Sequence, residues 1–183
     1  VADPEAIASA LDEVAGECGP AQESFVNPAK TLALELLDAL PVIAAEGPVA
    51  GAAATRIEDQ LATLAGLPTT GFRLPDQRVA ACAVLGGPLA PQDAGDLFRD
   101  REDDAGRHLR LLTIRDTDAG EHDGAGEREP RSATAAMDEI FRIAAAHNVP
   151  VSGLAEHGDP NRFARLPRLA RQLAVADFTA VYL

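Results

Sequence analysis

Short apolar runs alternate with longer amphipathic segments in this chain, and this order restricts the folds that are open to it. Runs of aliphatic residues bounded by Gly, Pro or polar residues are typical of buried strands. We predict four of them, at Pro41–Ala45, Arg78–Leu85, His108–Ile114 and Val149–Leu154. Strands that alternate with helices of crossover length favour a parallel sheet covered on both faces, with right-handed connections. The pattern therefore predicts an α/β fold.

Proline and N-cap residues mark where the first two helices begin. Asp3 precedes Pro4, and Asn27 precedes Pro28, which suits an N-cap followed by the first helical residue. Other helices are predicted from apolar spacing and end signals. The predicted helices are Pro4–Glu17, Pro28–Leu40, one from Glu46-Gly47-Pro48 to Gly66, one from Ser132 to Asn148, and a final one carrying Leu166, Leu169, Leu173, Ala176 and Ala180. Residues 91–106 are expected to form a polar helix or loop, and residues 116–131 an acidic, glycine-rich loop.

The length and charge of the chain exclude several classes of protein. Its 183 residues fit one domain, and a formal net charge of −13 argues against a protein that binds duplex nucleic acid. No apolar run approaches the roughly 18 residues of a membrane span, and no charged-then-apolar leader opens the chain. Cys18, in a predicted loop, and Cys82, in a predicted core strand, lack metal-ligand spacing. We expect a cytoplasmic protein that uses neither metal nor cofactor and contacts neither nucleic acid nor a membrane.

Both ends of the chain point to a longer protein. The first residue is Val1 rather than Met, and helical apolar spacing continues to Leu183 with no Gly or Pro to close the helix. We therefore expect these residues to be one domain of a two-domain chain.

Ligands of parallel sheets bind outside the carboxyl ends of strands, so the loops that follow the predicted strands are candidate sites. These loops are residues 46–51, 86–91, 115–131 and 155–160. In the first loop, Glu46, Gly47 and Pro48 open a helix whose free backbone N–H groups could hold a phosphate. Pro48 removes one donor and Glu46 would repel phosphate, although Glu46 could accept hydrogen bonds from sugar hydroxyls. An ordinary strand-to-helix turn is the alternative.

Two other loops carry titratable side chains. Glu156, His157 and Asp159 follow the fourth predicted strand, where an imidazole beside carboxylates could transfer protons or could simply be solvated. The acidic loop could form a weak cation site or a solvated insertion; its residues are Asp116, Asp118, Glu121, His122 and Asp123. The chain contains no P-loop, no Gly-x-Gly-x-x-Gly motif and no nucleophile elbow.

Four segments of the chain resemble one protein family. They are Asn27–Ala33 (NPAKTLA), Leu40–Ile43 (LPVI), Ala54–Leu61 (ATRIEDQL) and Asp177–Leu183 (DFTAVYL). In this order they are similar to the second sugar isomerase (SIS) domain of bacterial and archaeal bifunctional phosphoglucose/phosphomannose isomerases, and most of all to the actinobacterial SIS-like proteins called TobH-like. The resemblance implies a flavodoxin-like three-layer sandwich with a four- to five-stranded parallel sheet of SIS type. It also implies that residues 1–183 are a single SIS domain that packs against an N-terminal SIS domain.

The resemblance assigns two catalytic positions as well. These isomerases use a glutamate as base and a histidine that assists ring opening, and aligning Gln60-Leu61 and Leu74-Pro75-Asp76 puts Thr63 and Val79 there. Moving a proton between adjacent carbons through an enediol needs a base of near-neutral pKa. Neither a threonine hydroxyl nor a valine side chain provides one. Either another residue, such as His157 or Glu46, has taken over, or the domain does not isomerise.

Three functional hypotheses follow. The first is a degenerate SIS domain that binds a sugar phosphate or related carbohydrate derivative, or helps to assemble a homodimer, without catalysis. The second is an active isomerase of glucose 6-phosphate or mannose 6-phosphate with a displaced or partner-supplied site. The third is an unrelated flavodoxin-like interaction module. For the first two we expect a ligand pocket at the carboxyl edge beside Glu46, Gly47 and Thr63, with Arg56 or Arg73 meeting the phosphate.

Overall fold

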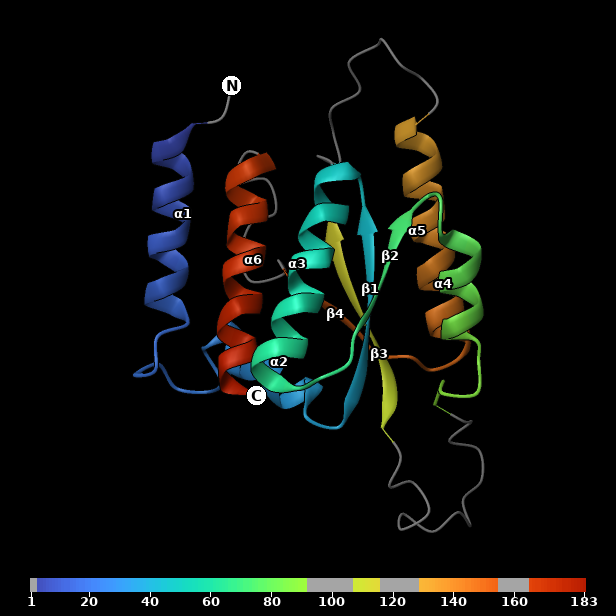
Figure 1. The fold of residues 1–183 in the computed structure, drawn as a ribbon, viewed down its shortest axis with the longest axis horizontal. Coiled ribbons are helices and arrows are strands. Elements are labelled where there is room, and N and C mark those ends of the chain that lie inside the picture. Colours follow the sequence, from blue (N-terminus) through green and yellow to red (C-terminus); the bar gives the residue numbers. More distant parts are fainter. Residues whose placement is uncertain (1–2, 92–106, 116–128, 155–164) are drawn as a thin grey trace.

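The computed structural model describes residues 3–91, 107–115, 129–154 and 165–183. Within these residues the chain forms six helices and four strands (Figure 1). In chain order they are α1 (Pro4–Glu17), α2 (Pro28–Leu36), β1 (Ala39–Glu46), α3 (Pro48–Ala65), β2 (Thr70–Leu74), α4 (Arg78–Leu85), β3 (His108–Arg115), α5 (Glu129–Ala146), β4 (Val151–Gly153) and α6 (Arg165–Tyr182).

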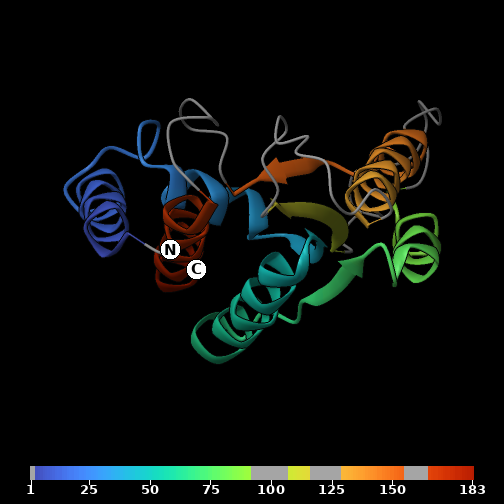
Figure 2. The same cartoon turned by 90° about the horizontal axis from the view of Figure 1, so that it is seen from above.

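The described strands form one parallel sheet in the order β2-β1-β3-β4. One apolar core joins the sheet to α2, α3 and α6, and a second joins its other face to α4 and α5. Figure 2 shows these two groups of helices on opposite sides of the sheet, and α1 lies outside α6. The predicted α/β class, the parallel four-stranded sheet and the three-layer arrangement are confirmed.

Several predicted helix ends are confirmed by capping contacts. The Asp3 side chain accepts hydrogen bonds from the N–H groups of Glu5 and Ala6, and Asn27 accepts one from Lys30. At the other end of α3, Gly66 adopts a left-handed conformation with φ of 62°, which suits a residue without a Cβ. Asn148 likewise ends α5 with φ of 54°.

The prediction of a strand at Arg78–Leu85 is wrong, because these residues form α4. The run is rich in alanine, which favours helix over strand, and only one side of the helix is buried, at Ala81 and Leu85. The second strand is instead Thr70–Leu74, at the edge of the sheet. Loop 86–91 therefore follows a helix and lies near the start of β3, where the Leu109 N–H donates to the carbonyl of Leu89. It is not at the carboxyl edge.

Smaller predictions also need correction. Leu40 belongs to β1 rather than to the preceding helix, and Ser132 lies inside α5, which begins at Glu129 with proline as its second residue. The fourth strand is shorter than predicted, since β4 spans Val151–Gly153. Proline is favoured in the first turn of a helix, which explains why α5 starts before the predicted cap.

Cys18 lies in the turn after α1, as predicted, whereas Cys82 does not lie in a strand. Cys18 is buried where α1 ends and packs against α6, and the Tyr182 hydroxyl donates to its carbonyl at 2.5 Å. Cys82 is partly buried on α4 rather than in a strand. Burial raises the pKa of both thiols. In the described part of the chain, no helix is long and apolar enough to cross a membrane.

Candidate functional site

A pocket of about 460 Å³ lies between α3 and β2, the edge strand that lies next to this helix in Figure 2. Its volume is within the range of about 300–1,000 Å³ that is common for small-molecule sites. Residues from α3, β2 and the turn after β2 line it: Gly51, Ala54, Thr55, Glu58, Gly71, Arg73, Asp76 and Gln77. The lining thus combines one cation, two carboxyl groups, a hydroxyl and an amide.

Arg73 crosses from β2 onto α3. Its Nη2 donates to Thr55 Oγ1 at 3.2 Å, and its backbone N–H donates to Gln77 Oε1 at 2.7 Å. A Cβ on Gly51 would lie 3.2 Å from both Cγ and Cδ of Arg73. The arginine stem therefore lies across the position where any other residue would carry a side chain.

Glu58 makes the reverse crossing, from α3 onto β2. A Cβ on Gly71 would collide with its carboxylate, and the Gly71 backbone donates a hydrogen bond to it. Burial raises the pKa of the Glu58 carboxyl above 4.5; the bond from Gly71 and the charge of Arg73 oppose the rise, and Asp59 adds to it. Glycine is otherwise unfavourable inside a strand, so Gly71 marks a close approach.

Chemically, this lining suits a hydroxyl-rich ligand with one anionic group. A guanidinium can donate two parallel hydrogen bonds to a phosphate or carboxylate, and carboxyl groups accept from sugar hydroxyls. Arg73 was predicted as a possible phosphate contact, but Thr55, Glu58, Asp76 and Gln77 were not predicted. The available signal was the pair of glycines, one on the predicted helix and one in Thr70-Gly71-Phe72-Arg73, on which no prediction was based.

The predicted residue Glu46 faces away from this pocket. It is 1% exposed and lies on the α5 side of the sheet. Thr134 Oγ1 donates to its Oε1 at 2.8 Å, and Arg115 Nε lies 2.9 Å from its Oε2. The carboxylate is thus occupied by partners from α5 and β3.

The predicted cluster of Glu46, Gly47 and Thr63 does not come together within this chain. Gly47 is the N-cap of α3, and Thr63 lies in its last turn, where its hydroxyl donates to the carbonyl of Asp59. Sixteen residues of helix at about 1.5 Å each separate them by about 24 Å. Arg56 faces α6, where its Nη2 lies 2.8 Å from Asp177 Oδ2. The ligand-binding roles of these residues stay predictions.

The two positions matched to the catalytic pair are also far apart. Thr63 precedes β2, whereas Val79 follows it, in the first turn of α4, and is 72% exposed. Thr63 therefore lies near the end of the sheet where β2 begins, and Val79 lies near the end where β2 stops. His157 and the Glu156–Asp159 segment lie outside the described residues, as do residues 92–106 and the acidic residues 116–128.

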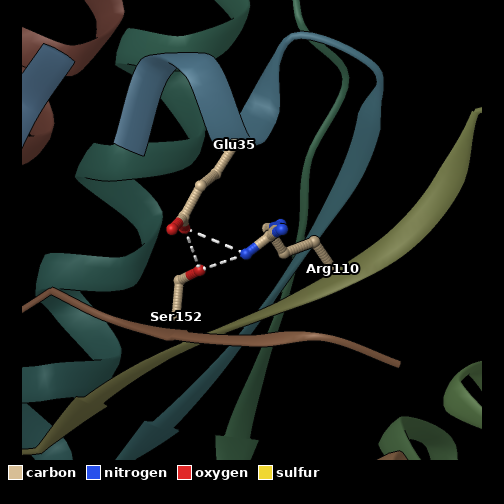
Figure 3. A network of polar contacts seen from close by, with 3 residues as sticks. All are labelled: Glu35, Arg110 and Ser152. Carbon is tan, nitrogen blue, oxygen red and sulfur yellow. Dashed lines mark hydrogen bonds and ion pairs between the residues drawn. The ribbon is translucent and has the colours of Figure 1, made fainter. Parts of the chain in front are cut away.

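A second polar cluster connects α2 to the sheet (Figure 3). Arg110 Nη1 donates to Glu35 Oε2 at 2.9 Å and to Ser152 Oγ at 2.7 Å, and Ser152 Oγ donates to Glu35 Oε2 at 2.5 Å. A pocket of about 120 Å³ lies beside it. Sequence reasoning missed this cluster, although a charged residue inside an otherwise apolar strand was a visible signal. In the described residues, no group of three or more His, Cys, Asp or Glu could hold a metal ion.

Comparisons with known proteins agree with the fold. Residues 25–183 match the family model of the bacterial phospho-glucose isomerase C-terminal SIS domain. The crystal structure of a glucose-6-phosphate isomerase like protein from Thermus thermophilus is similar, with 20% identity and a TM-score of 0.56 over 97% of this chain and 50% of that chain. The chain thus spans about half the length of that structure. No curated protein matches the chain significantly in sequence.

The family match covers most of the chain and all the described elements from α2 to α6. It excludes the hypothesis of an unrelated flavodoxin-like module. This chain therefore belongs to the family of the bacterial phosphoglucose isomerase C-terminal SIS domain.

Proposed function

We propose that this SIS domain binds a phosphorylated sugar and does not isomerise it through the glutamate and histidine positions of its family. The observation that carries the ligand class is the match of residues 25–183 to a phosphoglucose isomerase family. The presence of Thr63 and Val79 at the two aligned positions supports the loss of that catalytic pair.

The chemistry of isomerisation supports this proposal. A base must remove a proton from one carbon of the sugar and return it to the neighbouring carbon. A threonine hydroxyl is too weakly basic for that step, and valine exchanges no proton. Loss of a positioned base typically slows such a reaction by about 10²–10⁴-fold.

Two measurements on the same preparation test the proposal. Isothermal titration calorimetry with glucose 6-phosphate, mannose 6-phosphate and fructose 6-phosphate should give saturable binding of at least one. Proton NMR of the same mixtures should show no interconversion above the buffer control. Absence of binding by all three compounds would refute the ligand class, and clear turnover would refute the loss of catalysis.

A second candidate function is an active isomerase with a displaced base, and Glu58 is the observation that favours it. Glu58 is a partly buried carboxyl whose pKa burial raises, and burial is one way in which enzymes tune a carboxylate to act as a general base. Glu46 is a weaker candidate because Thr134 and Arg115 already occupy it. If turnover is seen, Glu58→Gln should abolish it, while Glu46→Gln should leave it measurable.

We also propose that the domain assembles with a second SIS domain, in a homodimer or in a longer chain. Exposed apolar side chains around α2 support a contact surface: Phe25 before the helix, Leu34 on it and Leu37 just after it are 84%, 67% and 55% exposed. Light scattering after size exclusion should give twice the monomer mass for the homodimer. A monomeric mass that persists at high concentration would refute it.

A further inference from the structure

We propose that the pocket between α3 and β2 is where the phosphorylated sugar binds, with Arg73 and Thr55 at the phosphate and Glu58 and Asp76 at the sugar hydroxyls. The ligand class rests on the proposed function, whereas the location comes from the geometry of this pocket. Of the residues predicted for a pocket at the carboxyl edge, Arg73 lines this pocket, whereas Glu46, Gly47, Arg56 and Thr63 do not.

Two side chains build the pocket, and each extends from its own element over a glycine of the other element. Arg73 leaves the strand and lies over Gly51 of the helix, and Glu58 leaves the helix and lies over Gly71 of the strand. Glycine inside a helix or a strand is destabilising relative to alanine. Both elements carry this cost at the positions where the other element's charged side chain must pass.

Three contacts hold the guanidinium of Arg73 in one orientation. Arg73 is held through its stem by Gly51, through its backbone by Gln77 and through Nη2 by Thr55. A guanidinium has five N–H donors, and one of them is engaged by Thr55 among the described contacts. A phosphate can therefore be met by a pre-positioned fork, with less side-chain entropy to lose than for a free surface arginine.

The carboxyl groups of Glu58 and Asp76 should make the pocket discriminate between inorganic phosphate and a sugar phosphate. A simple anion such as inorganic phosphate gains Arg73 but meets the negative charge of Glu58 and Asp76 and, next to Glu58, of Asp59. A sugar phosphate has hydroxyls that both pocket carboxyl groups can accept from, which offsets that repulsion. We therefore expect the pocket to prefer a hexose phosphate over both inorganic phosphate and the unphosphorylated hexose.

Calorimetry with fructose 6-phosphate, inorganic phosphate and fructose as separate titrants tests this assignment. For the wild-type protein, fructose 6-phosphate should bind most tightly. Arg73→Gln removes a charge-assisted contact and should weaken its binding roughly 10–100-fold. Arg73→Lys keeps the charge but loses the fork, and should bind with intermediate affinity.

A matched control is Arg142→Gln, since Arg142 is an exposed arginine of α5 on the far face of the sheet. Its affinity should stay within about twofold of wild type, a change of about 0.4 kcal/mol at most. Thermal unfolding of each variant verifies that it is folded.

The outcomes separate the two proposals. Wild-type affinity in both Arg73 variants, or a loss of binding in Arg56→Gln instead, would overturn the pocket assignment and leave the proposed function standing. If the wild-type protein binds none of the hexose phosphates, the proposed function fails, and the pocket assignment fails with it.

Discussion

At the scale of single residues, Gly51 and Gly71 make the α3–β2 pocket possible. Each provides the space through which a charged side chain of the facing element passes. The two positions are not equivalent. A methyl group on Gly51 would press on the stem of Arg73, whereas one on Gly71 would displace only the end of the flexible Glu58 side chain.

Gly71→Ala should therefore expel the Glu58 carboxylate into solvent with little effect on stability. Burial is the main cause of the raised pKa of Glu58, so its exposure should lower that pKa toward 4.5, even though the bond from Gly71 is lost. Carboxyl ¹³C NMR over a pH series measures this change. The matched control is Gly16→Ala in α1, where a Cβ meets nothing within 4 Å. An unchanged Glu58 pKa in Gly71→Ala would contradict the predicted displacement.

Glu58→Gln should make the stability of the folded protein less dependent on pH. A carboxyl whose pKa is higher in the folded state than in the unfolded state binds more protons when folded, so its ionisation lowers stability as the pH rises from 4.5 through the folded pKa. Glutamine keeps an acceptor for the Gly71 backbone and does not ionise. Urea unfolding should therefore show that the free energy of unfolding of the variant, relative to that of wild type, is higher at pH 7 than at pH 4. A difference that is the same at both pH values would refute the role assigned to burial.

At the scale of elements, the sequence predicted most of the helices and strands but misplaced one strand. Caps at Asp3, Asn27 and Gly66 are local contacts between neighbours in the chain, so residue type and spacing were enough to predict them. The segment Arg78–Leu85 is apolar for most of its eight residues, and length and burial alone do not separate a short helix from a strand. Its alanine content was the evidence that should have decided for helix.

The edge strand β2 was missed for a related reason. Only Phe72 and Leu74 of its five residues are buried, and Gly71 and Arg73 break the apolar pattern. Those two residues break the pattern because they form the pocket with α3. The part of the candidate site that the sequence analysis did not find is therefore the part made by contacts between α3 and β2. Gly51 and Gly71 were a local sign of it, but a glycine alone does not tell which element lies opposite.

The cluster of Glu35, Arg110 and Ser152 joins three elements, and we expect it to hold α2 against the sheet. Ser152→Ala removes one donor and one acceptor and should lower the free energy of unfolding by about 1–2 kcal/mol. Amide hydrogen exchange should also quicken in β4 relative to β1. Ser24→Ala, at an exposed serine before α2, is the control and should change stability by less than about 0.5 kcal/mol. Equal stability of Ser152→Ala and wild type would show that the cluster contributes nothing.

At the scale of the whole molecule, the two faces of the parallel sheet carry different polar groups: the contacts of Glu46 on one face and the α3–β2 pocket on the other. Glu46 is enclosed by β1, β3 and α5, whereas Arg73 lies on the opposite face of the sheet, where Glu58 of α3 also lines the pocket. The sequence predicted one site at the carboxyl edge because ligands of parallel sheets bind outside the carboxyl ends of strands, and the family resemblance added Thr63 to it. Strand alternation sends Glu46 and Arg73 to opposite faces, and that fact required the register and order of the strands.

The most direct test of the pocket assignment is a ¹H–¹⁵N NMR titration of the protein with fructose 6-phosphate. Glycine amides resolve well, and Gly51 and Gly71 line the pocket, whereas Gly16 and Gly66 do not. We predict saturable changes in the chemical shifts of the Gly51 and Gly71 amides with one dissociation constant. The amide signals of Gly16 and Gly66 should not shift. Saturable shifts centred on Gly47 with no change at Gly51 and Gly71 would contradict it.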